Sequence, residues 1–551
     1  MKNAKIKNII LLAGLGFILT NSCTKLDEKV YDNIILEKTK FTKKDIPNII
    51  APAYISLRDV YWGWNGLFDI SEECADLIVT PGRENGWGDL YIDMHKHTWN
   101  SYIEHGANLW RNSFTGINNI NRAIEFLDKI KGEGDNFDNY YAELRGLRAY
   151  YYYLLLDHFR NVPIVTKYTF PKGWLPDQNT GQEVYDFVES ELKEVMPQLS
   201  EDNNTNTYGR FTKWAAKMVL AKLYLNAEVY VGVPKWNDAK AQVQEVIASN
   251  KFKKADNYAD PFLAENAGSV EQIFSIPFDE VHAPGSYYPY KTLAPEGRAT
   301  YNLSDAWGGS CGIPQFFDTY DPDDSRLKAC WLSGLQFSYT GDTIKWNTSD
   351  SINGKLVPVI KPLVYTKYLT DINKTKMNEG YRFVKYEIRV GLQGNQGNDV
   401  PLFRFTDALM IQAECLLRTG NADSAALIVT QIRNRAFKTN LSKATVTGSD
   451  LQQDSKYNYG AYVYNVKDST VTITKSANDN APIQYGRFLD ELAWEFVGEH
   501  HRRQDLVRFG VFTKKSWYAH KPNGDYRVLF PIPQEQMNTN SKLKQNQGYT
   551  N

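Results

Sequence analysis

Apolar residues recur every three or four positions over long stretches of this chain, most regularly between about residues 105 and 255. This spacing places the side chains on one face of an amphipathic helix. Further helices are expected over about 46–60, 401–437 and 486–510. The stripe that opens the longest helical region consists of Trp110, Phe114, Ile117, Ile120 and Ile124. The pattern therefore predicts a mainly α protein.

Two pairs of the predicted helices resemble tetratricopeptide units, in which small residues let antiparallel helices approach closely. In the later pair, Ala413 and Ala425 flank a short turn at Gly420-Asn421-Ala422. The copies are divergent and are not consecutive in the sequence. The earlier pair is indicated by Ala221, Tyr224, Trp236 and Ala239.

Between the predicted helices lie long stretches rich in Gly, Pro, Asn, Asp, Ser and aromatic residues. They run over about 61–104, 256–400 and 438–485. Loops this long inside a compact chain are uncommon unless they serve a function. We therefore expect a single mainly α domain over 46–551, with tetratricopeptide-like helix pairs as its scaffold and a long loop-rich face that binds a ligand.

The first residues have the pattern of a secretory signal. Lys2, Lys5 and Lys7 precede an apolar run at 9–19, which is shorter than the roughly 20 apolar residues that a membrane-spanning helix needs. Small residues then lead to Cys23, which becomes a lipidated N-terminus if the signal is cleaved before it. We expect a lipoprotein signal peptide over 1–22 and a lipidated tether over 23–45, with acyl chains that anchor the protein without a spanning helix.

The balance of charges limits the classes of partner that the protein can bind, and the cysteines leave one disulfide possible. The formal net charge is −1 over 551 residues, with 63 basic and 64 acidic side chains. Because nucleic-acid binding depends on clustered Lys and Arg, no nucleic-acid partner is expected. With Cys23 assigned to lipid, a bridge between Cys311 and Cys330 remains open, since spacing alone cannot establish one.

One motif resembles a hydrolase nucleophile. Ser310 stands in Gly308-Gly-Ser-Cys-Gly312, which fits the G-x-S-x-G elbow. Such an elbow needs a buried apolar strand before the serine, and the preceding residues here are too polar for one. A turn beside Trp307 is the simpler interpretation. The sequence also has no phosphate-binding glycine loop. We therefore expect no catalytic residue, no enzyme activity and no cofactor.

Two groups of residues could suggest a metal. His95 and His97 would suit zinc with a third ligand, but no spacing indicates one. Carboxylates are spaced suitably for calcium at Asp321, Asp323 and Asp324, but the glycine and distal glutamate of a calcium loop are missing. Helix capping explains these aspartates more simply. No metal site is predicted, although a structural calcium ion stays open.

Two tryptophans stand in polar, glycine-flanked loops instead of helical stripes: Trp87 within Arg83-Glu-Asn-Gly-Trp-Gly-Asp89, and Trp307 within Asp305-Ala-Trp-Gly-Gly309. Indole faces stack on the C–H faces of sugars, while neighbouring Arg, Asn and Asp pair with hydroxyls. The alternative is that each tryptophan only plugs its loop onto the scaffold. We expect both to converge in one shallow, solvent-open groove. The other candidate ligand-binding residues are Arg83, Asn85, Tyr287, Tyr288 and Tyr290.

The C-terminal part of the chain resembles the SusD/RagB-like family. The strongest likeness is the segment from Arg487 to Gly510, RFLDELAWEFVGEHHRRQDLVRFG. The ending FPIPQ at 530–534, with LKQN at 543–546 and Gly548-Tyr549, is similar to the family too. Further similar positions are Leu26-Asp27 after Cys23, His97-Thr98-Trp99, and Asp321 to Arg326. The resemblance covers essentially the whole chain.

This resemblance implies a lipid-anchored protein of the outer membrane that faces the cell exterior. Members pair with a TonB-dependent transporter of the SusC type and hold glycans, or sometimes peptides, for uptake. Their ligand aromatics come from the corresponding early and mid-chain loops, and Trp307 lies in the better match. The early loop differs in length and sequence from the starch-binding pattern, which puts starch specificity in doubt. Capture of a glycan is the favoured function; capture of a peptide, or a structural lid without its own ligand, are the alternatives.

Overall fold

The structure is a computed structural model that describes residues 41–61, 65–283, 285, 288–352, 354–467, 470–478 and 481–550. The chain separates into two compact units, Met1–Asp45 and Ile46–Asn551. In the first unit, the described residues form the 3₁₀ helix η1 (Lys43–Asp45), where the Thr42 amide and hydroxyl donate to the Asp45 carboxylate at 2.7 and 2.9 Å. The predicted lipidation site, Cys23, lies outside the described residues.

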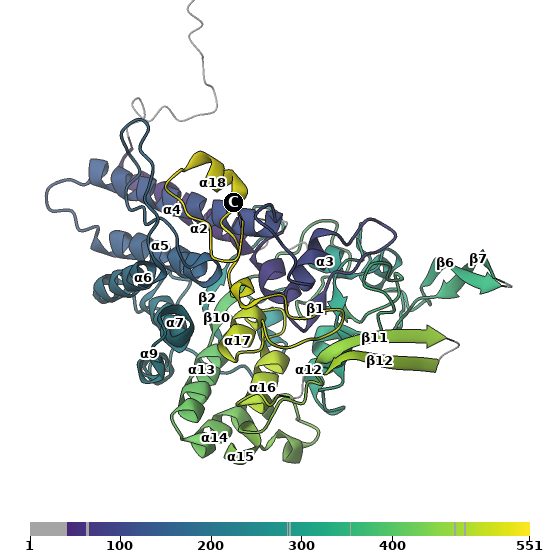
Figure 1. Ribbon diagram of the computed structural model, residues 1–551. Helices are drawn as coiled ribbons and strands as arrows, with labels where there is room; N and C mark the ends of the chain where they lie inside the picture. The colour runs from purple at the N-terminus through teal and green to yellow at the C-terminus, as the bar shows by residue number, and fades with distance from the viewer. Residues whose placement is uncertain are drawn as a thin grey trace, which may run out of the picture. The chain divides into compact units, whose positions relative to one another are not determined.

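Long helices open the second unit (Figure 1). Helix α4 packs on α2 and on α5, and α5 packs on α6. Gly116 of α4 allows a close approach, because a Cβ there would lie 2.4 Å from the ring of Tyr151. The Tyr151 hydroxyl donates to the Ala53 carbonyl of α2 (2.9 Å), so that this side chain joins three helices. The four helices are α2 (Ile46–Tyr61), α4 (Glu104–Ile130), α5 (Asp138–Phe159) and α6 (Gly181–Val195).

The two expected helix pairs are present. In the later pair, Ala413 and Ala425 are fully buried. Gly420 has a φ of 84° between them, and the Asn421 amide donates to the Leu416 carbonyl (2.8 Å). This left-handed glycine closes the first helix and starts the turn. The pairs are α7 (Lys213–Leu225) with α9 (Trp236–Ala248), and α13 (Phe405–Arg418) with α14 (Ala422–Arg433).

The described strands form six antiparallel pairs rather than one large sheet. Strands β2 (Gln272–Ile276) and β10 (Val400–Arg404) pair in the interior, and every residue of both is buried. Two hairpins, β6 (Lys345–Ile352) with β7 (Lys355–Pro362) and β11 (Gly460–Lys467) with β12 (Thr470–Asn478), extend away from the helices (Figure 1). Both lie in stretches that were expected to be loops. In β7 aliphatic side chains on both faces are exposed, so no one-sided alternation marks it as a strand.

Among the described helices, none combines the length and the apolar character that crossing a bilayer requires.

The remaining elements are short, apart from α16. These elements are η2 (Asp69–Glu73), β1 (Ile78–Val79), α3 (Leu90–His95), η3 (Met196–Gln198), α8 (Ala227–Val231), η4 (Asp260–Phe262), α10 (Tyr288–Thr292), η5 (Glu296–Thr300), β3 (Cys311–Gly312), α11 (Pro314–Phe317), α12 (Ser325–Cys330), β4 (Trp331–Leu332), β5 (Gly334–Leu335), β8 (Val364–Tyr365), β9 (Arg382–Phe383), η6 (Leu441–Ala444), α15 (Gly448–Leu451), α16 (Gly486–Phe496), α17 (Arg502–Arg508), η7 (Asp525–Val528) and α18 (Gln534–Thr539).

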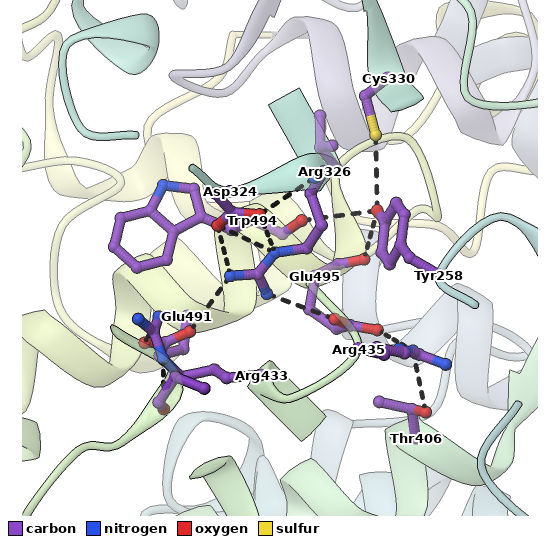
Figure 2. Close-up of polar contacts among 12 residues, drawn as sticks. Tyr258, Asp324, Arg326, Cys330, Thr406, Arg433, Arg435, Glu491, Trp494 and Glu495 are labelled. Atoms are coloured by element: carbon purple, nitrogen blue, oxygen red, sulfur yellow. Dashed lines mark hydrogen bonds and ion pairs between the residues drawn. The ribbon is translucent and has the colours of Figure 1, made fainter. Parts of the chain in front are cut away.

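Helix α16 carries buried carboxylates that hold arginines from several other segments. Glu495 pairs with Arg326 of α12 at 3.3 Å, Arg404 of β10 at 3.0 Å, and Arg435 at 2.5 Å. Figure 2 shows Arg326 and Arg435 converging on this carboxylate. Burial alone would raise the pKa of Glu495, but the three arginines outweigh it and hold the pKa well below its usual range. We call these four residues with Glu271, which also binds Arg404 and Arg435, the Glu495 network.

Candidate functional site

Two loops carry the candidate ligand-binding tryptophans, and the first connects β1 to α3. It turns where the Gly86 amide donates to the Arg83 carbonyl (3.0 Å) and the Arg83 amide donates to the Trp87 carbonyl (2.9 Å). Gly86 has a φ of 98°, a conformation that residues with a Cβ rarely adopt. The turn leaves Asn85 exposed and Trp87 half-buried.

The second loop lies along the short helix α10. The amides of Trp307 and Gly309 donate to the carbonyls of Tyr290 and Lys291, both at 2.6 Å. Gly308 has a φ of 67°, and a Cβ there would collide with the side chain of a neighbouring methionine. The two glycines after the tryptophan therefore let the backbone follow α10 closely, while the Trp307 ring stays half-buried.

The structure brings these two loops together. The indole nitrogen of Trp87 donates to the Trp307 carbonyl (2.7 Å), and the Asn85 side-chain amide donates to the same oxygen (2.5 Å). The Trp87 ring also lies close to Gly309, where a Cβ would be 2.9 Å from it. The expected convergence of residues that are 220 positions apart is therefore confirmed. The shallow groove between them, and its role in binding, stay predictions.

The two indoles differ in how much of the fold they touch. Trp87 packs at 5.5 Å from the Tyr91 ring, and the Lys291 ammonium lies 5.9 Å from its ring centre. Trp307 rests on the Tyr290 ring at 5.5 Å, and its indole nitrogen donates to the carboxylate of its own loop residue Asp305 (2.8 Å). Trp87 therefore helps to join the two loops, whereas Trp307 packs against the buried cluster that includes Tyr290, Leu293 and Ile388.

A buried charge cluster supports the loops from below. Lys291 of α10 forms ion pairs with Asp69 and with Glu73 (2.6 Å), which lie at the two ends of η2. Burial alone would lower the pKa of Lys291, but Asp69 and Glu73 outweigh it and raise the pKa. The Tyr91 hydroxyl donates to Asp69 (3.0 Å), and the Lys291 ammonium lies 4.3 Å from the Tyr91 ring centre. The cluster thus fixes α10, along which the Trp307 loop runs.

Ser310 belongs to this cluster. Its hydroxyl donates to the Glu73 carboxylate (2.6 Å) and lies 3.0 Å from the Thr80 hydroxyl, and the side chain is fully buried. The short strand β3 follows the serine and pairs antiparallel with β1. A nucleophile elbow has its serine after a central parallel strand. The arrangement here agrees with the simpler interpretation of a glycine-rich turn beside Trp307.

Arg83 does not form a polar edge of a groove, so that prediction is wrong. Its side chain is buried and donates to the carbonyls of Gly309 (3.1 Å), Lys376 (2.6 Å) and Glu379 (3.1 Å). Burial, and to a lesser extent the charge of Arg382, lowers the pKa of Arg83 to about 9. The guanidinium therefore ties three loop segments together and is not available to a ligand.

The tyrosines predicted around 287–290 are also misassigned where the structure describes them. Tyr288 is buried against Phe68 and Phe383, with ring centres at 4.1 and 5.1 Å. Tyr290 is buried as well; its hydroxyl donates to the Gly394 carbonyl, and its ring supports Trp307. Both are packing residues because α10 is held against the core. Tyr287 lies outside the described residues.

The histidines considered as zinc ligands lie in the core. His95 and His97 each place Nε2 against a backbone carbonyl, that of Tyr518 (2.6 Å) and that of Cys74 (2.7 Å). Burial lowers the pKa of His95 to about 4 and that of His97 to about 3, so both rings are neutral at physiological pH. Within the described residues, no group of three or more His, Cys, Asp or Glu side chains is placed to hold a metal ion.

The cysteines of the described chain are all unbridged, which answers the open question of a Cys311–Cys330 disulfide. Arg83 lies 3.3 Å from the Cys311 sulfur, and the Tyr258 hydroxyl lies 3.5 Å from the Cys330 sulfur. Burial raises the pKa of the Cys330 thiol to about 11. These thiols are buried packing residues.

Sequence reasoning missed the supporting residues Lys291, Asp69 and Glu73. A basic and two acidic residues more than 200 positions apart give no signal in one sequence. Asp69 and Glu73 do have the four-residue spacing of one helix face, but nothing in the sequence indicates that this face is buried.

Comparisons with known proteins agree with this architecture. A family model described as "SusD family" matches residues 314–549, and one described as "Starch-binding associating with outer membrane" matches residues 26–225. The starch-binding protein SusD of Bacteroides thetaiotaomicron is 27% identical over 466 residues, which cover 77% of this chain and 75% of that protein.

Solved structures show the same fold. A laminarin-binding SusD-like protein superposes with a TM-score of 0.68 at 20% identity, covering 93% of this chain and 100% of that one. Surface glycan-binding protein A from Bacteroides thetaiotaomicron, in complex with laminarihexaose, gives a TM-score of 0.65 at 19% identity, covering 92% of this chain and 100% of that one. With matches at both ends of the sequence and a shared fold throughout, the chain belongs to the SusD/RagB-like family.

Proposed function

We propose that this protein is a non-enzymatic lipoprotein that captures a glycan at the cell surface and delivers it to a TonB-dependent transporter of the SusC type. The observation that carries the proposal is the joining of the Trp87 and Trp307 loops through the Trp307 carbonyl. Relatives described as binding starch, laminarin or surface glycans support a carbohydrate ligand.

The ligand site is built on Trp307. A half-buried indole on a rigid backbone offers an apolar face to the C–H groups of a sugar ring at little entropic cost. Asp305 and Asn85, which are exposed beside it, provide polar groups at the rim of the same surface. Shallow recognition leaves much of the ligand in water, so we expect weak affinity, about 4–8 kcal/mol or micromolar to millimolar dissociation constants.

The N-terminus supplies the anchor in this proposal. Cleavage before Cys23 and acylation of its side chain attach the domain over 46–551 to the outer membrane through the tether 23–45, facing the cell exterior. Labelling with radioactive palmitate tests this directly. Wild-type protein should carry label and Cys23→Ala should be released unlabelled; a labelled Cys23→Ala variant contradicts the anchor.

A ligand panel tests the function. Calorimetry on the full-length protein in mild detergent, with laminarihexaose, maltohexaose and a mixture of tri- to hexapeptides, should show binding to at least one glycan and none to peptide. Peptide binding that survives Trp307→Ala would favour a peptide carrier, and no binding to any member would favour a structural lid.

The transporter partnership needs a separate measurement. Extraction under mild detergent and low salt should co-purify the protein with a large outer-membrane β-barrel protein. Recovery of a free monomer only, under the same conditions, contradicts the partnership and leaves the glycan site untouched.

A further inference from the structure

A groove lies on the helical scaffold, between the loop 203–208, the end of α9 and the loop that leads into β2. Its volume is about 570 Å³, within the range of about 300–1,000 Å³ that ligand-binding pockets occupy. None of the residues that line it belongs to the Trp87 or Trp307 loops. The groove therefore needs an explanation separate from the proposed glycan site.

Hydrogen bonds between main-chain groups and one side chain fix the walls of this groove. The Asn203 side-chain amide donates to the Lys251 carbonyl (2.9 Å), and the Lys253 amide donates to the Val270 carbonyl (3.0 Å). These two bonds tie three separate segments of the chain to one another. The groove is therefore formed before any ligand arrives, which lowers the cost of binding.

The lining is rich in hydrogen-bonding groups and carries positive charge. Lys251 and Lys253 are exposed and, within the described part of the chain, neither forms an ion pair. No carboxylate lines the groove. The nearby Glu201 carboxylate is already paired with Lys213 at 2.5 Å. The amide and hydroxyl side chains of the lining include Asn203, Asn204, Tyr208, Asn250, Ser269 and Gln272.

The floor of the groove is closed by Gln272, which is 5% exposed and whose Oε1 lies 2.5 Å from the Tyr208 hydroxyl. The same hydroxyl also contacts the Asp399 carboxylate. The groups that can reach a ligand are therefore the exposed side chains of the rim, among them Asn203, Asn204 and Asn250.

An adjoining groove of about 350 Å³ differs from the first groove in its charged side chains. It shares Lys253 with the first groove, but it also contains Asp256, Asp260 and Glu265. An anion is repelled by these carboxylates, which Lys253 also faces, so the Lys251 side of the first groove, whose lining contains no carboxylate, is the more favourable place for negative charge. We therefore expect the negatively charged group of a ligand to lie near Lys251.

We propose that the groove at Lys251 and Lys253 binds an anionic sugar unit, such as a uronate residue of an oligosaccharide. The hydroxyls of such a sugar match the amides and hydroxyls of the lining, and its carboxylate matches the two ammonium groups. The site is independent of Trp307 and adds a charge requirement that an aromatic platform cannot supply.

Hexagalacturonate is the test ligand, and laminarihexaose is its neutral counterpart. In calorimetry on the full-length protein in detergent, Lys251→Met/Lys253→Met should weaken hexagalacturonate binding at least tenfold. The control Lys328→Met/Lys355→Met removes two exposed lysines elsewhere and should leave binding unchanged. No binding by the wild type, unchanged binding by the groove variant, or an equal loss in the control overturns the site.

Chemical labelling locates the ligand without a substitution. Acetylation of Lys251 and Lys253, followed by mass spectrometry, should be at least threefold slower with saturating hexagalacturonate, while Lys328 is unaffected. Equal labelling with and without the sugar contradicts the assignment. Trp307→Ala separates this inference from the proposed function, because it should abolish neutral glycan binding and retain binding of hexagalacturonate.

Discussion

The Glu495 network and the two tryptophan loops use polar and aromatic groups in opposite ways. In the network, the carboxylates of Glu495 on α16 and of Glu271, just before β2, pair with guanidinium groups from three other segments, and all five side chains are nearly inaccessible. Figure 2 shows Glu495 with Arg326 and Arg435. In the loops, backbone amides and carbonyls supply most of the bonds, and both indoles remain half-buried. Charges that pair with one another hold the fold, whereas partly open aromatic faces leave area for a ligand.

This contrast explains what the family signature encodes. The segment from Arg487 to Gly510 contains Glu495 and Glu499, and both bind Arg404. The strongest sequence likeness therefore lies in residues that tie the C-terminal helices to the scaffold. A shared signature predicts a shared fold, but it says nothing about the ligand, whose proposed site lies on loops elsewhere in the chain.

The largest effect should come from breaking the network. Glu495→Ala leaves three arginines without their shared carboxylate in a buried site, which costs about 3–5 kcal/mol of unfolding free energy. Urea unfolding followed by far-ultraviolet circular dichroism measures this loss. The control Glu535→Ala breaks the exposed pair with Arg111 and should cost less than about 1 kcal/mol. Similar losses in both variants would mean that burial of the network has no energetic consequence.

Lowering the pH should reduce the stability that another buried carboxylate, that of Glu414, gives to the fold. Burial alone would raise the pKa of Glu414, but Arg508 and Arg418 outweigh it and lower the pKa to about 2. A carboxylate with a lowered folded-state pKa stabilises the protein above its unfolded pKa of about 4.5, and that stability is lost as the pH falls towards 2. At about 1.36 kcal/mol per pKa unit, the full contribution is roughly 3 kcal/mol.

Comparing wild type with Glu414→Gln isolates this contribution. The variant lacks the titrating group, so the difference in unfolding free energy should be greatest at pH 6 and should shrink steadily between pH 4.5 and pH 3. A difference that is constant over this range would contradict a lowered pKa for Glu414.

A smaller effect is expected where two helices meet. Ala413 of α13 is fully buried, and α13 packs on both α9 and α14, so Ala413→Leu should overpack the contact of α13 with its neighbours and cost about 1–3 kcal/mol. A thermal melt measures it. The matched control is Leu427→Ala on α14, where the side chain is 68% exposed and should contribute little. An unchanged midpoint for Ala413→Leu would show that the contact has room to spare.

The helical scaffold could be predicted from the sequence because it depends on local spacing. The α13–α14 hairpin follows from Ala413, Gly420 and Ala425, and the structure has it at these positions. The hairpin of β6 and β7 could not be predicted, because the apolar residues of β7 face solvent on both sides and give no periodic signal. Patterns reveal elements that bury one face, and not those that project from the fold.

For the candidate site, the residue types predicted the tight loops, but the sequence did not show which side chains are buried. Glycines beside Trp87 and Trp307 marked tight loops, and the loops do meet. Arg83 and Tyr288 stand in equally polar or glycine-rich surroundings, yet long-range packing buries both. Which neighbour of a loop tryptophan faces solvent depends on segments hundreds of residues away, and one sequence does not contain that information in readable form.

The two tryptophans should differ from each other in stability. Trp87→Ala removes the hydrogen bond to the Trp307 carbonyl and the contacts with Tyr91 and Lys291, and should cost roughly 2 kcal/mol, about half the loss for a fully buried tryptophan. Thermal melts of Trp87→Ala and Trp87→Phe measure this. Because phenylalanine keeps much of the ring packing, Trp87→Phe should lose less; an equal loss would assign the effect to the hydrogen bond alone.

Trp307→Ala should have the smallest effect on stability and the largest on binding. Its indole rests on Tyr290 and bonds Asp305 of its own loop, while the carbonyl that joins the two loops belongs to the backbone and survives the substitution. Its half-buried ring also packs on the cluster around Leu293 and Ile388. We therefore expect a loss of unfolding free energy smaller than the roughly 2 kcal/mol of Trp87→Ala, and no measurable binding of the neutral glycan. Calorimetry and a thermal melt on this one variant decide between the two roles of a loop tryptophan. Normal binding would mean that Trp307 is not the platform, and a loss near the 3–5 kcal/mol of a core tryptophan would mean that it plugs the loop onto the scaffold.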